Sequence, residues 1–144
     1  MLIGRHDSKL DEKNRISFPY KFKKELGTNL VVTQGFEGSL IVISRDQMNL
    51  LTKGLEGKPM TNRQARDVEA FLLGSAEEVT LDNKGRFILP EHLKKYAGIT
   101  LEVACLGIMN YVRIWDKKRW EDYNRQHLIK NISEITEKLS NEGK

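Results

Sequence analysis

Two short polar segments of the chain contain the residue types that could bind an anion. Residues 11–15, Asp-Glu-Lys-Asn-Arg, recur at 82–86 as Asp-Asn-Lys-Gly-Arg, so each residue has a counterpart 71 positions later (82 minus 11). Arg15 and Arg86 are permanently charged forks whose planar donors match phosphate groups or guanine edges. Duplication of a core would repeat mainly its apolar pattern. A duplicated polar segment therefore indicates two copies of one functional surface loop.

The other residues of each segment are suited to shaping a loop. Asp11 and Asp82 can accept hydrogen bonds from backbone N–H groups two or three residues further on, which closes a polar turn. Gly85 suits a backbone position with positive φ, and Asn14 is one of the few other residue types that tolerate that conformation. We therefore predict that the aspartates, Asn14 and Gly85 structure the loops and that the arginines project from them.

A single Asp-x-x-x-Arg pattern is usually only a salt bridge that ties its own loop. Two such loops on a pseudo-symmetric body make a bivalent anion-binding face, which gains affinity when both loops engage one ligand. A DNA duplex, with its regularly spaced phosphates, is the natural ligand of this kind. Lys13, Lys84 and Arg5 are expected to strengthen the attraction for phosphate. The alternative is a protein-interaction module, such as an antitoxin or an assembly scaffold, that binds acidic partner proteins.

No pattern typical of catalysis or metal binding recurs in both copies. Glu12 of the first copy is replaced by Asn83 in the second, which argues against a duplicated carboxylate pair. The three histidines lack metal-site spacing, and there is no Gly-rich phosphate loop, G-x-S-x-G or H-E-x-x-H motif. We therefore expect no enzymatic activity, cofactor, metal or small-molecule substrate.

The regular elements around each motif also repeat. Pro19 and Pro90 stand at the expected first position of short helices that end at Gly27 and Gly98. A β-hairpin is expected after each short helix. The predicted hairpin strands are Leu30–Gln34 with Ser39–Ile43 in the first copy and Leu101–Leu106 with Tyr111–Trp115 in the second.

The two copies differ by one residue at their hairpins. Each copy is also too small to fold independently. The second hairpin is expected to turn around Gly107–Asn110, one residue out of step with the first. A helix follows each hairpin, with Ser44 and Asp116 as predicted caps. A unit of about 45 residues buries too little apolar surface to be stable alone. We therefore expect the copies to share a core or to obtain one by oligomerisation.

The repeat divides the chain into four parts. These are a first β-rich unit at 5–47, a helical connector at 48–75, a second unit at 76–119, and a C-terminal helix and tail at 120–144. Asn62 is the predicted cap of a connector helix. The apolar stripe of the C-terminal helix is of a kind that usually packs on its own subunit, with a neighbouring subunit as the alternative. Ser140–Lys144 is expected to fray.

Composition narrows the class of protein only slightly. The net charge of +4 suits an anionic partner without demanding one. Cys105 is the single cysteine, so no internal disulfide can form, and its apolar surroundings in sequence favour a small buried side chain. We find no signal peptide and no apolar run of bilayer-spanning length, so we expect a soluble intracellular protein.

The paired Leu-Asp-x-Lys-Gly/Asn-Arg-hydrophobic-x-hydrophobic-Pro motifs resemble those of the MraZ family of bacterial transcriptional regulators. The resemblance runs from Met1 to Asp116, and Leu72–Ser75 looks like the family's junction between units. It implies two AbrB-like (SpoVT-AbrB) units in one chain. One departure is Asn14, which stands where the family usually has glycine.

The resemblance also implies a function. It implies a regulator, commonly a repressor, that binds short repeats upstream of the division and cell-wall gene cluster encoding it. It further implies ring-like homo-oligomers and a cytoplasmic, nucleoid-associated location. Carried over, Asp11 with Arg15 and Asp82 with Arg86 are the functional pairs. We expect an α+β fold of two pseudo-symmetric AbrB-like units sharing a core, with double-stranded DNA and further copies of the chain as partners and no membrane contact.

Overall fold

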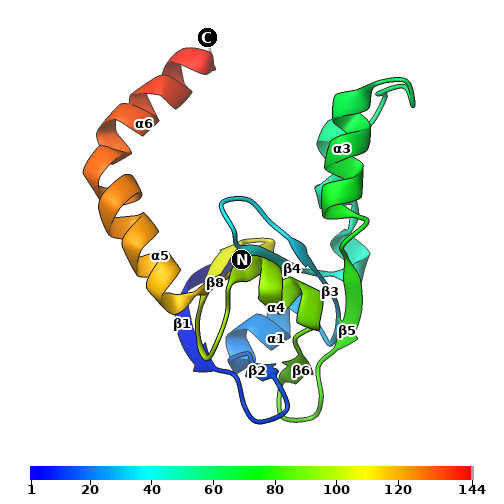
Figure 1. Ribbon diagram of the computed structural model, residues 1–144, viewed down its shortest axis with the longest axis vertical. Helices are drawn as coiled ribbons and strands as arrows, with labels where there is room; N and C mark the ends of the chain where they lie inside the picture. Colours follow the sequence, from blue (N-terminus) through cyan, green and yellow to red (C-terminus); the bar gives the residue numbers. More distant parts are fainter. Residues whose placement is uncertain (144) are drawn as a thin grey trace.

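A six-stranded antiparallel sheet forms the centre of the molecule, and a two-stranded ribbon lies beside it (Figure 1). The structure, a computed structural model, describes residues 1–143. The large sheet has the order β1-β7-β8-β4-β3-β5, and β2 pairs with β6 in the ribbon. The strands are β1 Leu2–Lys9, β2 Arg15–Ser17, β3 Asn29–Gln34, β4 Leu40–Ser44, β5 Glu77–Thr80, β6 Arg86–Ile88, β7 Glu102–Met109 and β8 Tyr111–Asp116.

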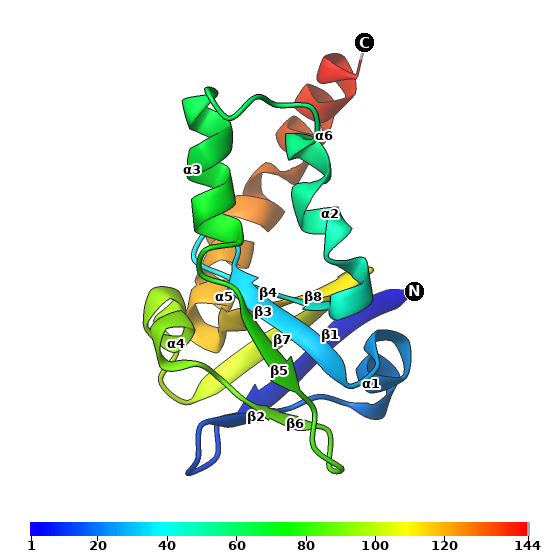
Figure 2. The same ribbon diagram turned by 90° about the vertical axis from the view of Figure 1, so that its right-hand side faces the viewer.

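Helices cover both faces of the sheet, which confirms the predicted α+β class. The short helices α1 and α4 lie with the ribbon on one side, and two helical arms, α2–α3 and α5–α6, project from the other (Figures 1 and 2). The α-helices are α1 Tyr20–Leu26, α2 Asn49–Thr52, α3 Arg63–Leu72, α4 Glu91–Ala97, α5 Lys117–Tyr123 and α6 Lys130–Glu142. The 3-10 turns η1 Arg45–Gln47 and η2 Lys53–Leu55 flank α2, and the π-helical turn η3 Asn124–Ile129 joins α5 to α6.

Each copy of the repeat lends its first strand to the hairpin of the other copy. β1 pairs with β7, from Leu2 opposite Met109 to Lys9 opposite Glu102, and β5 pairs with β3. Exchanging the two copies maps the strand order onto itself, so the sheet has pseudo-two-fold symmetry. The two units are therefore interlocked, and neither has a complete sheet by itself.

The pseudo-two-fold axis passes through two pairs of residues. In the ribbon, Ile16 of the first copy lies opposite Phe87, the residue that corresponds to Ile16 in the second copy. In the large sheet, where β4 and β8 meet, Ile41 lies opposite Arg113, its counterpart in the second hairpin. Because the axis crosses the centre of the ribbon, the two motif loops leave the ribbon at equivalent positions on either side of it.

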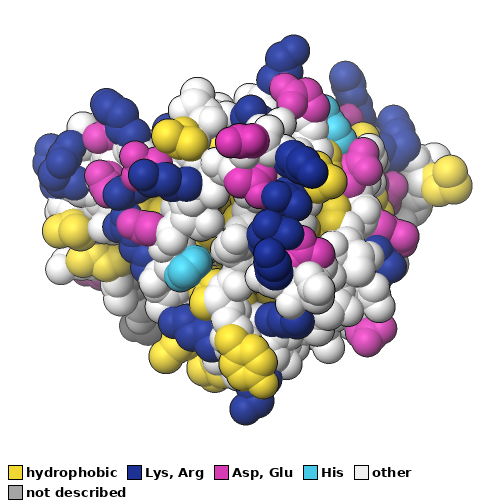
Figure 3. All heavy atoms as spheres, turned by 90° about the horizontal axis from the view of Figure 1, so that it is seen from below, with side chains coloured by type: hydrophobic (Ala, Val, Ile, Leu, Met, Phe, Trp, Pro, Cys, Tyr) yellow, Lys and Arg dark blue, Asp and Glu magenta, His cyan; other side chains and the backbone are white. Residues whose placement is uncertain are grey.

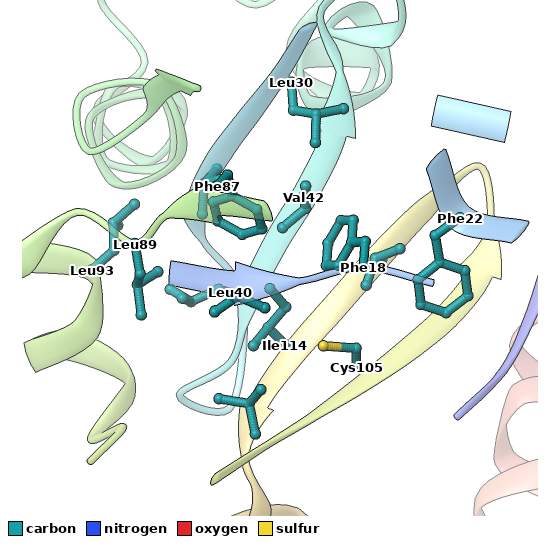
Figure 4. Close-up of a cluster of buried hydrophobic side chains, with 14 of the residues drawn as sticks. Phe18, Phe22, Leu30, Leu40, Val42, Phe87, Leu89, Leu93, Cys105 and Ile114 are labelled. Carbon is teal, nitrogen blue, oxygen red and sulfur yellow. The ribbon is translucent and has the colours of Figure 1, made fainter. Parts of the chain in front are cut away.

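One hydrophobic core joins the two copies, as the small size of each unit predicts. Phe18 packs edge-on against Phe22 of α1 and against Phe87 of β6, with ring centroids 5.7 and 5.3 Å apart. Leu89 and Leu93 from the second copy belong to the same cluster (Figure 4). The prediction of a shared core is therefore confirmed.

The short helices form where the spacing of proline and glycine predicts them. Pro19 and Pro90 are the N-caps of α1 and α4, so each helix begins one position later than predicted, at Tyr20 and Glu91. Gly27 and Gly98 end the helices with φ of 76° and 65°. These positive φ values explain why a glycine stands at the C-terminal end of each of the two helices.

Polar caps begin the remaining predicted helices. The side chains of Asn62 and Asp116 accept hydrogen bonds from backbone N–H groups three residues further on, at 3.0 and 3.2 Å. Both predicted caps are confirmed. Ser44 also accepts a backbone hydrogen bond, but it begins the 3-10 turn η1 rather than an α-helix directly.

The second hairpin turns later than predicted. β7 continues to Met109, which adopts a positive φ of 57° in the tight connection to β8. Gly107 lies inside the strand, opposite Gly4 of β1. A Cβ at Gly107 would lie 2.8 Å from the backbone nitrogen of Ile3. The predicted turn around Gly107–Asn110 is therefore correct at Met109 and Asn110 but wrong at Gly107, because this glycine permits the close approach of β1 instead.

The C-terminal helix packs on its own subunit only at its base. Trp120 and Tyr123 of α5 pack on Trp115 of β8, with ring centroids 5.5 and 5.0 Å apart. Beyond η3, α6 extends away from the sheet (Figure 1), and Ile132 and Leu139 are 51% and 68% exposed. The expected packing on the same subunit is therefore correct for α5 and wrong for α6.

The end of the chain is more regular than predicted. α6 runs to Glu142, so the expected fraying from Ser140 is wrong over those residues. Lys144 lies outside the described residues. Within residues 1–143, no helix combines the length and apolar character needed to cross a membrane.

Candidate nucleic-acid interface

The two motif segments form a pair of loops at the end of the molecule opposite the helical arms (Figure 2). Loop 1, residues 10–14, joins β1 to β2, and loop 2, residues 81–85, joins β5 to β6. In the ribbon, Arg15 lies opposite Ile88 and Arg86 lies opposite Ser17. Both arginines therefore begin strands of one ribbon, which brings the two motif copies together on a single face.

Each aspartate closes its loop through three hydrogen bonds. Oδ1 of Asp11 accepts from the backbone N–H groups of Lys13 and Arg15, both at 2.9 Å. Oδ2 of Asp11 accepts from Nε of Arg15 at 2.6 Å. Asp82 makes the same three contacts with its own lysine and arginine, each at 2.9 Å. The carboxylate thus fixes both the turn and the direction of the arginine.

These hydrogen bonds favour the ionised carboxylates. The backbone N–H of Arg15 makes the largest contribution to lowering the pKa of Asp11 to about 2, against an opposing effect of partial burial. The pKa of Asp82 is lowered as well, chiefly by the backbone N–H of Arg86. Each loop therefore contains an intact Asp–Arg ion pair at neutral pH.

Asn14 and Gly85 occupy the positive-φ position of each loop, with φ of 58° and 76°. Each donates its N–H to the carbonyl of the aspartate in its own loop at 3.0 Å. Their carbonyls accept from the N–H groups of Leu89 and Phe18 across the ribbon, at 2.9 and 2.8 Å respectively. Each loop is consequently bonded to the residue just after the ribbon strand of the other copy, and the two loops are held as a pair.

The outer donors of both arginines remain available to a ligand. Nε of Arg15 and of Arg86 is occupied by the neighbouring aspartate, while the side chains retain 25% and 24% exposure. Within residues 1–143, the terminal Nη groups of these two side chains make no hydrogen bond to the protein. Each guanidinium is thus held by its aspartate on one side and presents the other side for bidentate binding.

Positive charge gathers on this end of the molecule. Viewed from below, Lys and Arg side chains form a band through the centre of the face, with Asp and Glu beside it (Figure 3). Lys13 and Lys84 are exposed in the two loops. Glu12 is exposed in loop 1 where loop 2 has the neutral Asn83, so loop 2 is the more positive of the two.

The structure does not bring Arg5 to the loops. Side chains alternate along β1, and His6 packs edge-on against Phe22 of α1, with ring centroids 6.5 Å apart. Arg5 therefore faces the opposite side of the sheet, where it pairs with Asp7 at 2.7 Å and with Glu121 of α5 at 3.2 Å. This placement corrects the expectation that Arg5 adds charge beside the loops, and it gives Arg5 a role in holding α5.

Sequence reasoning missed one residue that contacts a loop directly. Nζ of Lys94, on α4, donates a hydrogen bond to Oδ1 of Asn14 at 3.1 Å. By sequence alone, Lys94 is only a cation near the end of a short helix, where it suits the helix dipole. No local pattern links two residues 80 positions apart, so the contact follows only from the paired arrangement of the two copies.

In the described part of the chain, the thiol is buried and the histidines belong to no cluster that could hold a metal ion. Cys105 is completely buried in the core, as predicted, and burial raises the pKa of its thiol to about 12. The thiol is therefore neutral at physiological pH and unsuited to nucleophilic attack. No three His, Cys, Asp or Glu side chains among residues 1–143 converge in a way that could hold a metal ion.

The fold and the loop face together define a two-repeat α+β protein whose interlocked copies present a duplicated basic motif at one end. A family model described as "MraZ protein, putative antitoxin-like" matches the chain twice, at residues 1–71 and 72–141. The two matches meet close to the junction between the connector and the second copy.

Full-length relatives support the same assignment. Proteins named "Transcriptional regulator MraZ" from Clostridium acetobutylicum, Clostridium beijerinckii and Syntrophomonas wolfei are 38%, 37% and 36% identical to the chain. Each alignment spans 143 residues and covers 99% of both proteins. The chain belongs to the MraZ family. It is accordingly a transcriptional regulator and not an enzyme.

Proposed function

We propose that this protein is a sequence-specific DNA-binding repressor that acts on the division and cell-wall gene cluster containing its own gene. The observation that carries the proposal is the pair of aspartate-held arginines, Arg15 and Arg86, on one ribbon. A two-stranded β-ribbon fits the major groove of B-DNA, and a guanidinium pairs bidentately with O6 and N7 of guanine. The ribbon would thus enter the groove while the loops follow the flanking backbones.

The residues of the face divide into three roles under this proposal. Arg15 and Arg86 make the base contacts, whereas Lys13 and Lys84, at the exposed loop tips, contact phosphates and supply salt-dependent affinity. Asp11 and Asp82 position the arginines, with Asn14 and Gly85 allowing the turn. Arg5 has no part in the face because it is paired with acidic residues on the other side of the sheet.

We further propose that the protein acts as a ring-like homo-oligomer in the cytoplasm, associated with the nucleoid. Support comes from α6, whose apolar residues Ile132 and Leu139 are exposed within residues 1–143. A helix with an uncovered apolar stripe is a typical protein–protein contact. Repeated copies of the loop face on one oligomer would suit short repeated binding sites, since linked contacts raise affinity.

The experiment that tests DNA binding uses a duplex from the region upstream of the protein's own gene. Fluorescence anisotropy at constant salt would compare the wild type with the Arg15→Ala, Arg86→Ala double variant. Each bidentate contact is worth about 1–3 kcal/mol, so affinity should fall at least about 30-fold. Arg125→Ala is the matched control, because Arg125 is a 70% exposed arginine on the helical arm, and it should bind like the wild type.

Two results would contradict the proposal. Undiminished binding by a folded double variant would exclude the arginines as the base-reading residues. Absence of salt-dependent DNA binding by the wild type, together with stoichiometric capture of an acidic protein partner, would favour an antitoxin-like interaction module instead. The words "antitoxin-like" in the description of the matching family model favour this second function as the alternative.

A further inference from the structure

The outer face of the ribbon carries four side chains, two of which the motif does not include. Side chains alternate along a strand, and Ile16 and Phe87 point into the core. Arg15, Ser17 and Arg86 therefore face outward, as does Ile88. Ser17 and Ile88 are consequently neighbours of the arginines on the proposed DNA-binding face.

The register brings each arginine next to one of these two residues. The backbone bonds from Phe18 and Leu89 to the opposite loops mark hydrogen-bonded pairs of the antiparallel ladder. Such pairs alternate with non-hydrogen-bonded ones, in which opposing side chains lie closer together. Arg15 with Ile88, and Arg86 with Ser17, occupy these close positions. Each arginine thus has one of these two residues directly opposite it across the ribbon.

These two neighbours break the pseudo-symmetry of the face. Ser17 and Ile88 are counterparts in the repeat, yet one is a small hydroxyl and the other a branched apolar side chain. Ile88 is 61% exposed, so burial within this chain does not account for an isoleucine there. An apolar side chain beside a base-reading arginine is chemically matched to the C5-methyl group of thymine, whereas serine can hydrogen-bond with any base pair.

We propose, building on the DNA-binding function above, that Ile88 and Ser17 are specificity-determining residues that make the two halves of the ribbon read different bases. Arg15 binds a guanine, and Ile88 packs on the methyl group of a neighbouring thymine, so this half of the ribbon selects both bases. Arg86 with Ser17 selects guanine without requiring a methyl group nearby. The ribbon therefore recognises a site without two-fold symmetry, and one orientation of the pseudo-symmetric protein on DNA is preferred.

The test removes single methyl groups from the DNA. Each thymine in the upstream duplex is replaced in turn by deoxyuridine, which lacks only the C5-methyl group, and binding is measured by anisotropy. For the wild type, one position should weaken binding about four-fold, the value expected for burying one methyl group. Ile88→Ser, which installs the residue of the first copy, should bind thymine and deoxyuridine equally at that position.

Further variants separate this inference from simple loss of fold. Ile88→Thr keeps the β-branched shape and one methyl group, so it should retain a reduced thymine preference. Ile3→Ala, a change at a 67% exposed isoleucine on β1, is the matched control and should leave the thymine preference intact. Ser17→Ile should create a new thymine preference at the pseudo-symmetric position.

The outcomes distinguish the two proposals. If the wild type binds the duplex and the arginine double variant does not, but no thymine shows an Ile88-dependent penalty, the specificity inference is overturned and DNA binding stands. If neither protein binds DNA in a salt-dependent way, the proposed function itself fails. A thymine penalty that Ile88→Ser abolishes and Ile3→Ala leaves unchanged supports both.

Discussion

Lys94 of α4 holds Asn14 of loop 1 through a hydrogen bond of 3.1 Å between Nζ and Oδ1. The two residues come from different copies of the repeat, so this bond fixes loop 1 to the opposite half of the molecule. Loop 2 has Gly85 at the same place, which offers no side-chain acceptor. The two loops therefore share a backbone shape, but loop 1 has an additional anchor.

The first prediction concerns this anchor. Asn14→Gly keeps the tolerance for positive φ and removes the hydrogen bond, so the free energy of unfolding should fall by about 1 kcal/mol. Lys94→Ala should remove the same bond. In urea denaturation, the double variant should therefore lose less than the sum of the two single losses. Strictly additive losses would show that the contact contributes nothing in solution.

The second prediction concerns the exposed lysines of the loops. Each phosphate contact contributes about one unit to the slope of log affinity against log salt concentration. The Lys13→Ala, Lys84→Ala double variant should therefore lower the magnitude of that slope by about 2 without changing the preferred sequence. Lys118→Ala serves as the control, since Lys118 is an 85% exposed lysine on α5. A slope unchanged in the double variant would remove these lysines from the interface.

The third prediction follows from the charge difference between the loops. Glu12 adds a negative charge to loop 1 where loop 2 has Asn83. Glu12→Asn should strengthen DNA binding about two- to five-fold at low salt, with the gain shrinking as salt screens exposed charges. Asn83→Glu should weaken binding to a similar extent. Equal affinities for all three proteins across a salt series would mean that neither position approaches phosphate.

The fourth prediction concerns the pH dependence of the loops. The pKa of Asp11 is lowered to about 2 in the folded protein, against about 3.9 in an unfolded chain. A lowered folded-state pKa stabilises the fold above the unfolded value, and this contribution is lost as pH falls through the folded value. Loop 1 should therefore keep its ion pair at pH 4 and lose it towards pH 2. NMR titration of the Asp11 carboxyl carbon measures this directly, and a midpoint near 4 would contradict the observed hydrogen bonds.

The fifth prediction concerns the exposed stripe of α6. Ile132→Lys with Leu139→Lys places charges on side chains that are 51% and 68% exposed in the single chain. If α6 mediates assembly, sedimentation should show a smaller oligomer, because burying these charges at an interface is costly. Ser133→Lys, at an exposed polar position of the same helix, is the control. An unchanged mass for the double variant would locate self-association elsewhere.

Much of the local structure could be predicted from sequence. The loop-closing role of Asp11 depends on contacts with residues no more than four positions away. The helices between proline and glycine and the caps at Asn62 and Asp116 also depend on neighbours in sequence. The position of the second hairpin turn cannot be predicted in this way, because a glycine such as Gly107 marks either a turn or a close approach. Only the position of β1 decides between the two.

Residue types and their spacing were enough to predict the chemistry of the motifs, their duplication and the need for a shared core. The fold of the whole chain decided that β1 and β5 exchange between copies, that Arg5 faces away from the loops, and that α6 leaves the body. It also decided that Ile88 stands beside Arg15, although 73 positions separate them (88 minus 15). The physical reason is that strand register and packing are set by contacts between distant segments, which no local pattern encodes.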